Sequence, residues 1–116
     1  MVVLDGEEAD VAKYLWKVSY TQAGVQGIMK EGGSSRRAMV EKLTAGLGGS
    51  LEAFFFAFGD DDVYVIADVP DAETAAAITL TVGASGAASI ETVVLLTPEQ
   101  IDAATKKSVD YRAPGA

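Results

Sequence analysis

The stretch LEAFFFAFGDDDVYVIADVP, residues 51–70, decides the fold. Its arms, 51–58 and 63–69, predict two strands of a hairpin, because glycine and aspartate in the segment between them accept the backbone angles of tight turns. In both arms apolar side chains occupy odd and even positions alike, so both faces of each strand are apolar. Both faces of such strands must be packed against other parts of the protein. A chain of 116 residues has few other elements that could cover the second face. We therefore expect a partner subunit to cover one face, with Phe55 or Phe56 at the contact.

The segment before the hairpin predicts a strand followed by two helical runs. Residues 12–20, AKYLWKVSY, alternate aromatic and apolar side chains with lysine and serine, which is the period of a strand. Thr21 is a candidate cap for a short helix, and Ser34 or Ser35 is a candidate cap for the second run.

The segment after the hairpin predicts a helix, a strand and a last short helix. Asp71 caps the helix over 71–85, and 88–97 has the alternation of a strand. Thr97 then caps a short helix with Pro98 at its first position. The order β-α-β-β-α-β with a C-terminal helix predicts an α+β, ferredoxin-like sandwich. Two helices cover one face of its sheet, and the open faces of two subunits pair as a dimeric α/β barrel.

Three stretches resemble the GYD domain family of small bacterial and archaeal proteins. The resemblance runs from about residue 12 to residue 112, with Gly59, Asp62, Pro70 and Asp71 in their expected places. Asp61 stands where the family motif usually has tyrosine, so a role that needs that phenol does not carry over. The resemblance implies a ferredoxin-like fold with dimeric barrel relatives, and it implies no particular activity. The three stretches are KYLWKVSYTQAGVQGIMKEGGSSRR, FGDDDVYVIADVPD and VLLTPEQ.

The chain divides into three predicted parts. Residues 1–11 are acidic and aperiodic, and we expect a mobile leader or a misassigned translation start. Residues 12–107 form the ferredoxin-like domain. The tail, 108–116, combines tyrosine, arginine and proline, and we expect it to dock on a neighbouring subunit.

Composition excludes several functions. The net charge of -8 opposes binding to nucleic acid and to anionic membranes, both of which require clustered lysine and arginine. The chain has no cysteine and no histidine, so the usual ligands for zinc, copper and iron are missing, and we predict no metal site and no cofactor. The sequence shows no secretory signal and no apolar run of membrane-spanning length, which favours a cytoplasmic location.

The acidic turn Asp60-Asp61-Asp62 offers carboxylates that calcium or magnesium could bind. A tight turn explains the same residues better, because charges end an apolar hairpin and the spacing is not that of an EF-hand. We therefore interpret these residues as a turn.

The best candidate ligand contacts combine positive charge with aromatic surface. Arg36 and Arg37 follow a glycine-serine segment, and their guanidinium groups suit a phosphate or carboxylate. Lys17 belongs to the first strand, close to Trp16 and Tyr20. These five residues predict a site for a small anionic or aromatic ligand between the helical layer and the opening of the sheet. Helix capping and core packing explain the same residues without a ligand.

Two functions fit this sequence. The first is a cytoplasmic homo-oligomeric binding or structural module whose sheet face is buried between subunits and which binds a small anionic ligand. The alternative is an enzyme without metal or redox cofactor, an isomerase or a cofactor-independent oxygenase, with its site in the barrel interior. Charged residues converging on a cavity would favour the enzyme.

Overall fold

The computed structural model describes residues 12–116, and the predicted leader, residues 1–11, lies outside the described residues. Within the described range the chain forms four strands and four helices. In chain order they are β1 (Ala12–Tyr20), α2 (Gln22–Glu31), α3 (Gly33–Gly46), β2 (Ser50–Phe56), β3 (Val63–Val69), α4 (Ala72–Ala84), β4 (Ala88–Leu95) and α5 (Pro98–Thr105).

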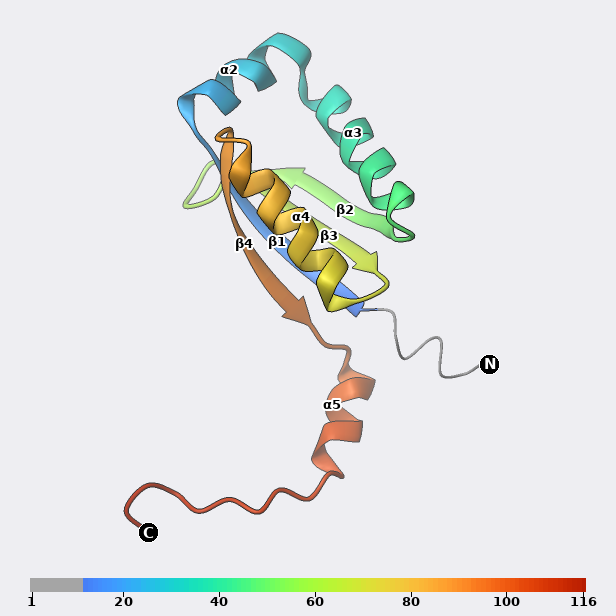
Figure 1. Ribbon diagram of the computed structural model, residues 1–116, viewed down its shortest axis with the longest axis vertical. Coiled ribbons are helices and arrows are strands. Elements are labelled where there is room, and N and C mark those ends of the chain that lie inside the picture. The colour runs from blue at the N-terminus through green and yellow to red at the C-terminus, as the bar shows by residue number, and fades with distance from the viewer. Residues whose placement is uncertain (1–11) are drawn as a thin grey trace.

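The four strands form one antiparallel sheet in the order β2-β3-β1-β4 (Figure 1). The first strand in the sequence therefore lies inside the sheet, between strands that come much later. This α+β arrangement is consistent with the ferredoxin-like fold that the order of elements predicts.

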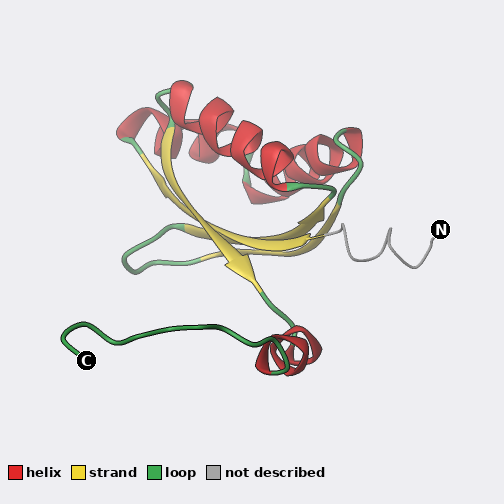
Figure 2. Cartoon of the chain, turned by 60° about the horizontal axis from the view of Figure 1, so that its bottom comes forward, coloured by secondary structure: helices red, strands yellow, loops and turns green. Residues whose placement is uncertain are grey.

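The helices α2, α3 and α4 cover one face of the sheet, as Figure 2 shows. Helix α5 and the tail lie on the other side, and every residue of 96–116 is exposed. The described helices, of which α3 is the longest, lack the length and apolar character needed to cross a membrane.

The core lies between the helices and the covered face of the sheet. Alternate residues of β1 and β3 point into it, as the period of a strand requires. Val63 and Val69 are at most 1% exposed, and the much larger Trp16 is buried beside them. The buried apolar residues are Trp16, Val18, Val63, Val65, Ala67, Val69, Ala75 and Ala88.

The other face of the sheet is also apolar, and no element within residues 12–116 packs on its centre. Strand register places Leu15 of β1 between Ile66 of β3 and Val93 of β4 on this face. Phe55 and Tyr64 pair beside them, and Phe55 remains 69% exposed. We call this surface the open face.

A β-bulge at Glu52 changes the expected assignment of β2 side chains to the two faces. Simple alternation puts Leu51 on the same face as Phe55. The register instead pairs Leu51 with the buried Ala67, and it shifts before Ala53, so Leu51 joins Phe54 on the covered face. Of the two phenylalanines expected at a subunit contact, the structure places Phe55 on the open face. Phe56 pairs with buried Val63 and lies under α3.

Most predicted helix caps are confirmed, and one is wrong. The side chains of Thr21, Asp71 and Thr97 accept backbone N–H groups at the starts of α2, α4 and α5. Helix α3 is capped by Gly32 rather than by Ser34 or Ser35, which lie inside the first turn. Gly32 has φ of 88°, a backbone angle that favours glycine, and this turn redirects the chain from α2 into α3.

Candidate functional site

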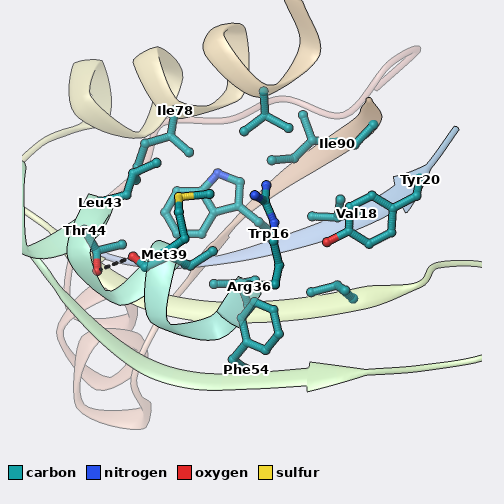
Figure 3. A pocket seen from close by; sticks show the side chains of 15 residues that line it. Trp16, Val18, Tyr20, Arg36, Met39, Leu43, Thr44, Phe54, Ile78 and Ile90 are labelled. Carbon is teal, nitrogen blue, oxygen red and sulfur yellow. Dashed lines mark hydrogen bonds between the residues drawn. The ribbon is translucent and has the colours of Figure 1, made fainter. Parts of the chain in front are cut away.

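An apolar pocket lies between α3, α4 and the covered face of the sheet (Figure 3). Its cavity volume is about 70 Å³. Met39, Val40 and Leu43 of α3 line one side, and Ile78 and Val82 of α4 line another. The sheet contributes the floor through Trp16, Val18, Phe54, Val65 and Ile90.

Trp16 supplies the unusual polar group of this pocket. It stands in the middle of β1, between Val65 and Thr92, and only 3% of its surface is exposed. Its ring packs against Tyr14 with 5.7 Å between centroids. Its Nε1–H is the one buried side-chain polar group in the described part of the chain that has no hydrogen-bond partner. Leaving a buried donor without an acceptor costs about 1–3 kcal/mol, so this group calls for an explanation.

Arg36 brings a positive charge to the same pocket. It lies in the first turns of α3, is half-buried, and extends toward the Trp16 side chain in Figure 3. Within residues 12–116 no carboxylate lies within 4 Å of its guanidinium nitrogens. The start of α3 packs closely on the sheet, because a Cβ on Gly33 would lie 2.9 Å from the Phe56 ring. Close packing there fixes where Arg36 projects.

The remaining polar lining residue on α3 is satisfied internally. Thr44 is 2% exposed, and its hydroxyl lies 3.0 Å from the carbonyl oxygens of both Val40 and Glu41. The hydroxyl proton is therefore used within the helix. No aspartate or glutamate is among the residues that line the pocket.

The structure brings together three of the five residues predicted as ligand contacts. Trp16, Tyr20 and Arg36 line the pocket. Arg37 is the next residue of α3, is exposed, and does not line it. Lys17 lies on the open face, because successive side chains of a strand point to opposite faces. A ligand in this pocket therefore does not reach Lys17, and the role of the other residues as ligand contacts stays a prediction.

Two charged clusters border the open face. The Lys13 ammonium group hydrogen-bonds to Glu52 and lies 3.0 Å from a carboxylate oxygen of Asp68. The hydrogen bond to Glu52, and next the one to Asp68, raise the pKa of Lys13 above its ordinary value. On the other side, Lys17 Nζ lies 3.6 Å from Glu91 and 3.8 Å from Asp61. Positively and negatively charged side chains therefore surround the apolar centre of the open face.

The acidic turn uses two of its carboxylates to hold β1. Asp62 accepts the backbone N–H of Tyr20 at 2.8 Å, and Asp61 accepts the Ser19 hydroxyl at 3.1 Å. Both side chains are half-buried. These contacts tie the segment between β2 and β3 to the end of β1, a structural role that the sequence analysis did not predict. Sequence reasoning did not foresee that Asp61 also faces Lys17.

The fold and the pocket define a small α+β sandwich domain with an apolar site under its helices and an uncovered sheet face. The GYD domain matches residues 14–105, which is most of the chain, and the protein therefore belongs to the GYD domain family. The resemblance seen in the sequence is thus confirmed. No curated protein and no solved structure matches the chain.

Proposed function

We propose that this protein is a cytoplasmic homo-oligomeric binding module. Its subunits pair through the open faces of their sheets, and each subunit binds a small anionic ligand between its helices and its sheet. The observation that carries the proposal is the two-sided sheet: one apolar face is covered by the chain's own helices, and the other is apolar and uncovered.

The composition of the open face supports self-association. Leu15, Tyr64 and Ile66 lie half-buried at its centre even in the single chain, and the exposed Phe55 extends this apolar surface. Apolar area of this kind is what interfaces between identical subunits bury. The clusters around Lys13 and Lys17 contain both signs of charge, so two copies related by a twofold axis can oppose unlike charges despite the net charge of -8.

The charge of the pocket supports an anionic ligand. Arg36 is the charged residue that lines it, and acidic residues are absent from that lining. Elsewhere an acidic chain repels anions, so this pocket is where an anion would be held. No observation on the described residues favours the alternative of a metal-free enzyme.

Sedimentation equilibrium at micromolar concentration tests the assembly. We expect a dimer or a larger homo-oligomer, and a stable monomer would contradict the pairing of open faces. A thermal-shift screen of matched small anions and cations tests the binding. Anions should raise the melting temperature of the wild type more than that of Arg36→Ala, and a preference for cations would contradict the proposed charge of the ligand.

A further inference from the structure

The pocket presents two nitrogen hydrogen-bond donors, and no carboxylate is among the residues that line it. The Trp16 Nε1–H has no partner, and the Arg36 guanidinium carries only donors. Both side chains line the same pocket, as Figure 3 shows. A ligand that suits them must carry an acceptor with negative charge.

A carboxylate matches this pair of donors better than a phosphate does. Its two oxygens accept hydrogen bonds without donating any, so one can bind the guanidinium while the other accepts the indole N–H. A phosphate needs more donors for its additional oxygens. Of the two hydroxyl groups on the residues that line the pocket, that of Thr44 is already engaged with its own helix, which leaves only the Tyr20 phenol. Apart from the hydroxyl groups of Tyr20 and Thr44, the remaining lining is apolar and suits a hydrocarbon group.

The volume of the pocket limits the hydrocarbon group. About 70 Å³ is less than half of the roughly 150 Å³ cavity that admits benzene. This space favours a short branched alkyl group of about four carbons over an aromatic ring or a long acyl chain. Met39 borders the space, and its flexible side chain allows small adjustments.

From these observations we infer that the ligand is a short-chain aliphatic monocarboxylate. Its carboxylate accepts hydrogen bonds from Trp16 Nε1–H and from Arg36, and its alkyl group fills the space between Val18, Leu43 and Ile78. This inference rests on the proposed function, because it names the chemical class of the anion proposed for that pocket.

The single tryptophan makes the contact directly measurable. Protein labelled with ¹⁵N gives one indole N–H signal, which belongs to Trp16. We would titrate the intact protein with isovalerate, with isopentanol as the neutral analogue and with isopentylamine as the cationic one. Isovalerate should shift the indole signal downfield in a saturable manner, and the alcohol and the amine should bind at least about tenfold more weakly.

Arg36→Gln and Arg37→Gln form a matched pair of variants. The two arginines are adjacent on α3, and each substitution removes one positive charge. Only Arg36 lines the pocket. Arg36→Gln should weaken isovalerate binding about tenfold or more, and Arg37→Gln should leave it within about twofold. Circular dichroism and the unchanged signals of the core would show that both variants fold.

Four results would overturn the inference. Equal affinity for isopentanol would mean that the pocket takes a neutral group, and tighter binding of isopentylamine would reverse the charge. Isovalerate binding that shifts other signals but not the indole would place the carboxylate elsewhere. Absence of isovalerate binding would exclude this class, while another anion found in the thermal-shift screen would leave the proposed function standing. Sedimentation tests the assembly separately.

Discussion

Trp16 and Lys17 are neighbours in the sequence and lie on opposite faces of the sheet. The Trp16 indole is buried beneath α3 and α4, whereas Lys17 Nζ lies 3.6 Å from Glu91 on the open face. One strand thus serves two surfaces, the pocket and the proposed subunit contact. Substitutions can therefore address each surface separately.

Phe55→Asp should disrupt the oligomer. Phe55 lies on the open face beside Tyr64, and a carboxylate buried there between subunits would have no partner. We expect monomers or aggregates in sedimentation experiments. Phe58→Asp is the matched control, because the Phe58 side chain is fully exposed in the turn. An oligomer that tolerates Phe55→Asp as well as Phe58→Asp would show that Phe55 is not at the contact.

The tail, residues 108–116, should be protected from proteases in the intact oligomer. In the single chain it is exposed throughout, although Val109 and Tyr111 offer apolar surface. Docking on a neighbouring subunit would bury these side chains and order the backbone. Limited proteolysis with mass spectrometry measures the rate of cleavage. Rapid loss of the tail from an oligomer whose melting temperature does not change would contradict docking.

The cluster around Lys13 should stabilise the fold up to alkaline pH. Hydrogen bonds to Glu52 and Asp68 raise the pKa of Lys13 above 10.5, so the folded state holds this proton more tightly than the unfolded state does. The contribution is complete below pH 10.5 and is lost as the pH rises through the higher folded value. Partial exposure of these side chains limits it to about 1 kcal/mol or less.

Urea unfolding of the wild type and of Lys13→Met, repeated from neutral to alkaline pH, measures this contribution. The difference in unfolding free energy should shrink above pH 10.5. Comparing the two proteins at each pH removes the effects of pH that they share. A difference that grows with pH would have the wrong sign for a raised pKa.

Two glycine substitutions should change stability in opposite directions. Gly27 lies inside α2 with no atom within 4 Å of an added Cβ, so Gly27→Ala should stabilise the fold by about 0.4–1 kcal/mol. An added Cβ on Gly49 would overlap the carbonyl oxygen of Asp68 in the backbone of β3. Gly49→Ala should therefore destabilise the protein. Thermal unfolding of both variants and of the wild type checks the pair. Equal melting temperatures for Gly49→Ala and the wild type would contradict the close approach of Gly49 to Asp68.

The sequence predicts the bounds of two strands correctly. Residues 12–20 and 63–69 form strands with the predicted bounds, because aromatic and β-branched side chains alternate there or fill both faces. The arm 51–58 is less regular: β2 ends at Phe56, and the bulge at Glu52 changes which side chains share a face. A bulge depends on pairing with another strand, so alternation within one strand does not reveal it.

The candidate site is only partly visible in the sequence. Arg36 and Trp16 could be selected by charge and aromatic character, but their meeting depends on how α3 crosses the sheet. The partnerless Nε1–H of Trp16 depends on every side chain around it, and no sequence pattern encodes that. The position of Lys17 was available from alternation alone, since it directly follows Trp16 on one strand.

The position of β1 inside the sheet also affects how the protein folds. The ribosome makes β1 first, yet its neighbours β3 and β4 are the third and fourth strands of the chain. Until those strands have been synthesised, β1 has none of the strands with which it pairs in the folded protein. Pairing at such long sequence separation slows folding relative to helical bundles of similar size. Until that pairing forms, the backbone hydrogen-bonding groups of β1 stay open to contacts with other chains.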